Sequence, residues 1–134
     1  MMPKQVTREQ KVRQFTDLQE EVSQFSKMVL QLRLMKEEMD EVEEAMKSWT
    51  YIRWKDADFS IGEKAALLKE LCDLQYVLSG TVVALGWDKI FDPAFNRVHE
   101  NNMSKFNGGK EVRKDGKTLK PEGYEKVNLQ DLVT

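Results

Sequence analysis

Residues 32–46 read LRLMKEEMDEVEEAM, and their apolar side chains recur every three or four positions. The recurring residues are Leu32, Met35, Met39, Val42 and Met46. An α-helix turns about 100° per residue, so this spacing places the five side chains in one stripe along a helix. The segment therefore predicts an amphipathic helix that packs through its apolar stripe.

Start and stop signals predict further helices on both sides of this segment. Neither Pro nor Gly occurs between Pro3 and Gly62, so long helices are expected there, with a break near Ser23 to Ser26 and an end near Trp49. The segment SWTYIRWKDADFSIGE (48–63) has no steady period and predicts an ordered loop. A short hairpin is expected around Asp115 and Gly116. The other signals are capping boxes at Thr7 with Gln10 and at Ser60 with Glu63, a C-terminal cap at Gly86, and an N-cap at Asp92 before Pro93. We predict an all-α bundle of four or five helices in a single domain, residues 1–134, with an irregular tail over 107–134.

Composition excludes several classes of function. The chain has 134 residues with 21 Lys and Arg against 23 Asp and Glu, a net charge of −2, so neither a nucleic-acid polymer nor a membrane is an expected partner. A single histidine, His99, and a single cysteine, Cys72, exclude zinc sites built from several such ligands. One cysteine also forms no internal disulfide, which favours a cytoplasmic location. We expect Cys72 to be a small buried residue.

Two acidic pairs stand beside apolar stripes at matching positions. Glu38 and Glu41 flank the stripe of residues 32–46, and Glu70 and Asp73 flank a second stripe of leucines over residues 67–78. The rotational offsets of the two pairs are nearly equal. If the two helices face each other through their stripes as an antiparallel pair, equal offsets bring both acidic pairs to the same side. Four carboxylates are then expected to converge.

Converging carboxylates repel each other unless a cation compensates their charge. Ligation by carboxylates alone favours a hard cation, so Mg²⁺ or Mn²⁺ is expected rather than Zn²⁺, and Mg²⁺ commonly binds substrate phosphates as well. Glu37 is a further candidate ligand. The alternative is a solvated helix face, because glutamate is a good helix former and needs no ligand there.

The same residues resemble a known family. The segments LMKEEMDEV (34–42) and KELCDLQYV (69–77) are similar to the ExxE and ExxD signature of the MazG-like all-α nucleoside triphosphate pyrophosphohydrolases. The later segments VHENNMSK (98–105) and DGKTLK (115–120), with Tyr124, resemble the phosphoribosyl-ATP pyrophosphohydrolase-like subgroup. The resemblance covers about Leu32 to Tyr124, and more weakly reaches Val12 and Phe15.

This resemblance implies hydrolysis of a nucleoside triphosphate to a monophosphate and pyrophosphate. It implies that Glu38, Glu41, Glu70 and Asp73 hold the metal, and we expect Glu38 or Glu41 to act as the catalytic base. The remaining expected substrate-binding residues are Asn102 and Lys105, Tyr76, Phe15, and Lys117 and Lys120 of the tail. For the two tail lysines, ordinary surface charge is an equally good interpretation.

Substrate and assembly stay open at this stage. Relatives take various nucleotides, among them purine deoxynucleoside triphosphates such as dGTP, and phosphoribosyl-ATP hydrolysis is the alternative activity. From a different class, a non-catalytic helical interaction protein would use the same stripes to bind partner helices. The resemblance and the chain's modest size favour a homodimer or homotetramer.

Overall fold

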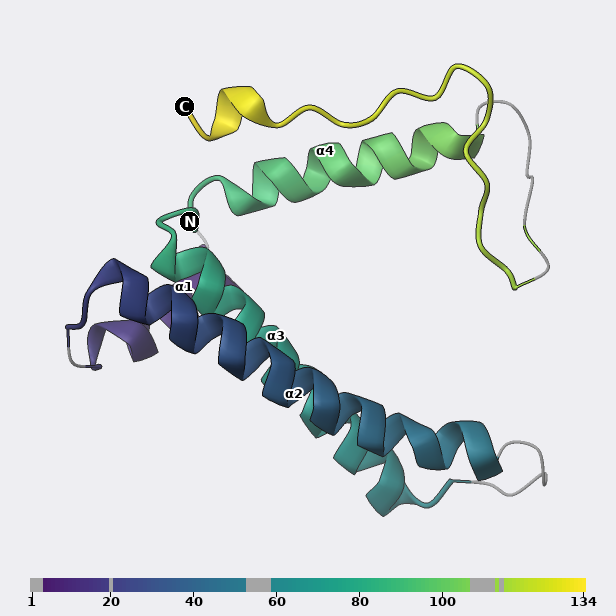
Figure 1. The fold of residues 1–134 in the computed structure, drawn as a ribbon, viewed down its shortest axis with the longest axis horizontal. Coiled ribbons are helices and arrows are strands. Elements are labelled where there is room, and N and C mark those ends of the chain that lie inside the picture. Colours follow the sequence, from purple (N-terminus) through teal and green to yellow (C-terminus); the bar gives the residue numbers. More distant parts are fainter. Residues whose placement is uncertain (1–3, 20, 53–58, 107–112, 114) are drawn as a thin grey trace. The chain divides into compact units, whose positions relative to one another are not determined.

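The computed structural model describes residues 4–19, 21–52, 59–106, 113 and 115–134. The chain forms two compact units, Met1–Asp88 and Lys89–Thr134, and each is described by itself. The first contains α1 (Arg8–Asp17), α2 (Gln24–Ile52) and α3 (Ile61–Ala84), and the second contains α4 (Phe91–Met103) (Figure 1). No strand occurs in the described ranges. The predicted all-α class is confirmed.

Local capping signals place most helix ends. Thr7 and Ser60 begin α1 and α3 with the predicted capping boxes, in which each hydroxyl accepts a hydrogen bond from the backbone N–H three residues on. The helical pattern breaks between Asp17 and Gln24, a few residues before the expected break near Ser23 to Ser26. Gly86 follows α3 with a φ of 76°, a conformation that suits glycine.

Two boundaries differ from the sequence prediction. Helix α2 continues to Ile52, past the expected end near Trp49. Helix α4 begins at Phe91, and its N-cap is Ile90, which makes no side-chain capping hydrogen bond. The predicted N-cap, Asp92, is therefore wrong, and Pro93 lies in the first turn, where a missing backbone N–H costs little. The expected loop spans 48–63; its part 53–58, which includes Trp54, lies outside the described residues.

Helix α3 packs against both other helices of its unit. Helices α2 and α3 run side by side in opposite directions (Figure 1), and Gln24 at the start of α2 donates a hydrogen bond of 2.9 Å to the carbonyl of Ala84 at the end of α3. Helix α1 is tied to the unit by Arg13, whose guanidinium makes two hydrogen bonds to Asp88. The antiparallel pair expected from the sequence is present.

The apolar stripes are only partly buried. The buried apolar residues of this unit are Val12, Val42, Val82 and Val83. Much of each stripe is exposed instead: on α2 Leu32, Met39 and Met46, and on α3 Leu71 and Leu78. The helices approach through Gln31 and Gly80, since a Cβ placed on Gly80 would lie only 3.2 Å from the Gln31 Oε1 atom. Such a close approach requires a residue as small as glycine at position 80.

In the second unit, the tail lies along α4. Arg97 of α4 makes hydrogen bonds of 2.6 and 2.7 Å to the Asp131 carboxylate. Asn101 donates to the carbonyl of Glu125 at 2.7 Å and accepts from the Tyr124 hydroxyl. A turn lies at Asp115 and Gly116, where a short hairpin is expected, and the Arg113 N–H donates to the Lys117 carbonyl across it. Within the described ranges, the search for a helix able to cross a membrane finds none.

Candidate metal centre

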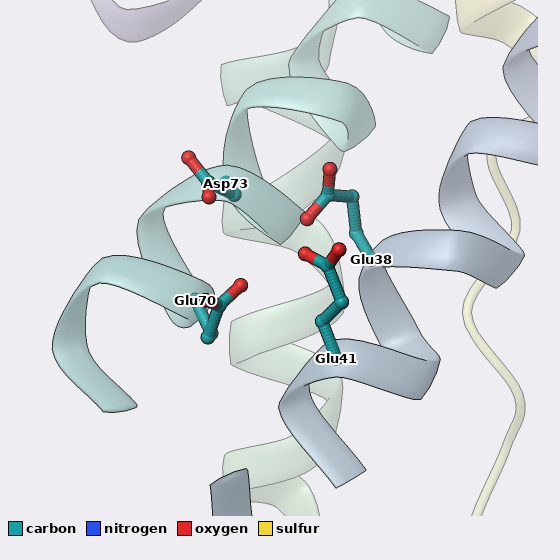
Figure 2. A group of neighbouring side chains, drawn as sticks. All are labelled: Glu38, Glu41, Glu70 and Asp73. Carbon is teal, nitrogen blue, oxygen red and sulfur yellow. The ribbon is translucent and has the colours of Figure 1, made fainter. Parts of the chain in front are cut away.

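Four carboxylates from α2 and α3 converge at one place in the first unit. Glu38 and Glu41 project from α2, and Glu70 and Asp73 project from α3 (Figure 2). One oxygen from each lies within 4.8 Å of the oxygens of the other three. The convergence predicted from equal helical offsets is therefore present in the structure.

The register of the two helices explains why the carboxylates meet. Gln31 of α2 lies opposite Gly80 and Thr81 of α3. In an antiparallel pair, equal steps away from a contact bring residues opposite each other. Seven residues from Gln31 and from Gly80 lead to Glu38 and Asp73, and ten residues lead to Glu41 and Glu70. The same steps of seven and ten, about two and three helical turns, keep each carboxylate near the contact side.

The burial of the carboxylates favours binding of a cation. Glu38, Glu70 and Asp73 are partly buried, and Glu41 is the exposed member. The Oε2 atoms of Glu38 and Glu70 are buried and have no hydrogen-bond partner in the part of the chain that the structure describes. Such an atom costs about 1–3 kcal/mol, and more when it carries charge. An all-oxygen donor set with unsatisfied atoms fits a hard divalent cation.

One lysine already contacts this carboxylate cluster. The Nζ atom of Lys69 lies 2.7 Å from Asp73 Oδ2 and 3.6 Å from Glu70 Oε1. The hydrogen bond to Asp73, together with attraction to Asp73, Glu70 and Glu41, raises the pKa of Lys69. Sequence analysis did not single out Lys69, although its spacing of four residues from Asp73 is the signal for such a pair.

Glu37, the fifth candidate ligand, is not a member of this cluster. Its side chain is exposed on α2, and the group of neighbouring ligand atoms consists of the other four residues. A step of one residue turns the helix by about 100°, so Glu37 and Glu38 leave α2 in different directions. Ligation by Glu37 stays a prediction.

Tyr76 of α3 contacts Phe15 of α1. Their rings form an edge-to-face pair with centroids 5.7 Å apart. Tyr76 also lines a cavity of about 340 Å³ between α1 and α3, with Arg8 and Lys11 from α1. Cys72 lines the same cavity and is exposed, so its expected burial is wrong. The cavity offers apolar and cationic groups, whereas the side of α3 facing α2 offers the carboxylates.

The other predicted substrate residues belong to the second unit. Asn102 is exposed near the end of α4, and Lys117 is exposed beyond the turn at Gly116. The ammonium groups of Lys105 and Lys120 lie 5.8 and 5.7 Å from the centroid of the Tyr124 ring. Tyr124 thus brings together two lysines that are fifteen positions apart in the sequence. Contact between these residues and a nucleotide stays a prediction.

Comparison with known families gives one match. The family model described as phosphoribosyl-ATP pyrophosphohydrolase matches residues 5–102, a range that includes all four carboxylates and Asn102. No curated protein matches the chain. Because the family model covers most of the chain, the chain belongs to the phosphoribosyl-ATP pyrophosphohydrolase family, nucleotide pyrophosphohydrolases within the MazG-like all-α superfamily.

Proposed function

We propose that this chain hydrolyses (deoxy)nucleoside triphosphates with the help of Mg²⁺ or Mn²⁺. Water attacks the triphosphate, the phosphoanhydride bond between the α and β phosphates breaks, and the products are a nucleoside monophosphate and pyrophosphate. The observation that carries this proposal is the convergence of four carboxylate oxygens within 4.8 Å. Family membership supports the reaction class, nucleotide pyrophosphohydrolysis.

In this proposal the four carboxylates hold the cation. When bound, a divalent cation would neutralise phosphate charge and lower the pKa of a bound water. The buried and unpartnered oxygens of Glu38 and Glu70 are suited to ligation, because a cation would satisfy them. Glu41 is the exposed member of the four, so solvent reaches it readily. We assign Glu41, or Glu38 beside it, to accept the proton of the attacking water.

Other side chains would orient the nucleotide. Asn102 and Lys105 are proposed to bind the triphosphate or the sugar, and Lys117 and Lys120 the phosphates. The closeness of Lys105 and Lys120 to one Tyr124 ring supports joint action on an anion. The edge-to-face pair of Phe15 and Tyr76 offers an aromatic surface for a base.

For the substrate, we propose a purine deoxynucleoside triphosphate such as dGTP. A panel of purified nucleoside triphosphates and phosphoribosyl-ATP, each incubated with Mg²⁺ and assayed for pyrophosphate and monophosphate, tests this choice. The expected result is release of both products in equal amounts, fastest with a purine deoxynucleotide, and none with the Glu70→Ala variant. If only phosphoribosyl-ATP is hydrolysed, it replaces the purine deoxynucleoside triphosphate as the proposed substrate. If no compound of the panel is hydrolysed, the proposed activity is rejected.

We also propose that the protein is a homodimer. The support is the set of exposed apolar side chains on α2 and α3, because apolar side chains gathered on one side of a helix pair favour association. A second copy would cover it by laying its own α2 and α3 against the first pair.

A further inference from the structure

We propose that Lys69 is a positioning residue that exchanges partners during the reaction. Without a bound cation, its ammonium group neutralises Asp73 and Glu70. When the cation binds, the ammonium group leaves the carboxylates and contacts a phosphate of the nucleotide. This inference rests on the proposed function, because it assumes that the four carboxylates hold a cation and that a polyphosphate binds to it.

The contacts of Lys69 place its charge where a cation would bind. Its Nζ atom is 2.7 Å from Asp73 and 3.6 Å from Glu70, both members of the carboxylate cluster. It also lies near enough to Glu41 to be attracted by that carboxylate. One ammonium group therefore interacts with both carboxylates of α3 and with one carboxylate of α2.

A divalent cation and Lys69 compete for the same carboxylates. Two positive charges a few ångströms apart repel each other strongly, even at a partly solvated site. The Asp73 oxygen that contacts Lys69 cannot use the same lone pair to ligate a metal ion. Binding of the cation is therefore expected to displace the ammonium group from Asp73.

Displacement of Lys69 requires no change in the fold. Its side chain is 66% exposed, and its four-carbon stem can take up another rotamer at little cost. The ammonium group then stays beside the cluster, because the backbone of α3 is fixed by its packing. Phosphates bound to the cation would be the nearest anions, and lysine is a common phosphate ligand.

An ordinary surface ion pair is the alternative explanation. Lysine and aspartate four residues apart on a helix often pair, and such exposed pairs contribute little to stability. Two properties distinguish the proposal from this alternative. Removal of the charge should strengthen binding of the cation alone, and it should weaken binding of the nucleotide.

The test compares Lys69→Met with the control Lys64→Met. Lys64 is an exposed lysine on the same helix, so both variants change the net charge equally and keep an unbranched side chain that suits a helix. Mn²⁺ is titrated by electron paramagnetic resonance in the absence of nucleotide. We expect Lys69→Met to lower the Kd for Mn²⁺ about five-fold or more, and Lys64→Met to change it less than about two-fold.

Steady-state kinetics with dGTP and Mn²⁺ supply the second measurement. We expect Lys69→Met to raise KM about ten-fold with a smaller change in kcat, and Lys69→Arg to restore most of the affinity because it keeps the positive charge. Equal Mn²⁺ binding in the two methionine variants, or an unchanged KM in Lys69→Met, would overturn the inference. Failure of the proposed function would look different: the unchanged protein would bind no Mn²⁺ and hydrolyse no nucleotide.

Discussion

Gln31 of α2 accepts a hydrogen bond from the Thr81 hydroxyl of α3, with 3.2 Å between Oε1 and Oγ1. A Cβ placed on Gly80 would lie 3.2 Å from the same Oε1 atom. This contact lies about 10 Å along the helices from the level of Glu38 and Asp73, because seven residues separate them at about 1.5 Å each. A contact with no charged group therefore sets the register that brings the carboxylates together.

The first prediction concerns Gly80. Leucine at this position would separate α2 from α3, so Gly80→Leu should lower the free energy of unfolding by about 2–3 kcal/mol and weaken Mn²⁺ binding. Urea denaturation followed by circular dichroism measures the first effect. Gly62→Leu is the matched control, since Gly62 lies in the exposed first turn of the same helix with only Ser60 nearby. Equal free energies of unfolding in the two variants would show that the close approach of α2 to Gly80 does not contribute to stability.

Sequence reasoning located features that depend on local chemistry. The capping boxes at Thr7 and Ser60 and the glycine after α3 involve residues adjacent in the chain, so their signals are visible without the fold. Convergence of the carboxylates was also predictable, because it follows from equal helical offsets and antiparallel connection. Lys69 was visible in principle as a partner four residues before Asp73.

Features that depend on tertiary contacts could not be predicted from the sequence. The stripes were expected to bury each other, but Met39 and Leu71 are exposed. Nothing in the sequence around Gly80 indicates that this glycine packs closely against Gln31. The start of α4 was misjudged for a similar reason: Asp92 is a strong local N-cap signal, yet the helix begins earlier, at Phe91.

The second prediction removes metal ligands. Glu70→Ala and Asp73→Ala should each reduce turnover at least about 100-fold, because each removes a carboxylate from the proposed cation site. Helicity measured by circular dichroism should stay nearly unchanged, since neither side chain belongs to the apolar core. Glu43→Ala is the control: Glu43 also lies on the paired helices, but it is exposed and forms an ion pair with Lys47, at 3.9 Å. Normal activity in Glu70→Ala or Asp73→Ala would contradict the assignment.

The third prediction concerns Lys105. Its replacement by alanine should raise KM for the nucleotide about ten-fold and leave kcat within about two-fold, because the lysine is proposed to bind phosphate in the ground state and the transition state alike. Lys126→Ala, which removes an exposed lysine from the same unit, serves as the comparison for net charge. If both variants shift KM equally, Lys105 acts only through the general charge of the surface.

The fourth prediction is a pH dependence of the tail. Hydrogen bonds from Arg97 hold the pKa of Asp131 below its usual value of 3.8. A carboxyl group whose pKa is lower in the folded state stabilises the fold above its unfolded pKa, and this contribution is lost as the pH falls through the folded pKa. The contact between α4 and residues 128–134 should therefore persist at neutral pH and loosen below about pH 4.

Amide chemical shifts of residues 128–134, followed by NMR during an acid titration, measure this loosening. In Asp131→Asn the transition should disappear, because asparagine does not titrate in this range and cannot form the same ion pair. If Asp131→Asn and the unchanged protein give the same titration curve, the acid transition belongs to another group.

The fifth prediction concerns self-association. On α2, Met39 and Met46 lie about 100° and 80° around the helix from Glu38, and on α3, Leu71 and Leu78 lie at the same angles from Glu70. Equal angles place the four side chains on one side of an antiparallel pair, and all four are exposed. A surface that combines two helices in this way suits a second copy related by a twofold axis, which would complete a four-helix arrangement.

Light scattering after size-exclusion chromatography should give about 31 kDa, twice the chain mass of 15.7 kDa. Leu78→Lys should shift the protein toward the monomer, because dimerisation would bury the new charge. Leu18→Lys should not, since Leu18, although 88% exposed, lies at the end of α1 outside this surface. A mass near four chains in the unchanged protein would indicate a dimer of dimers. A monomer at all concentrations would mean that the apolar surface of α2 and α3 serves another partner.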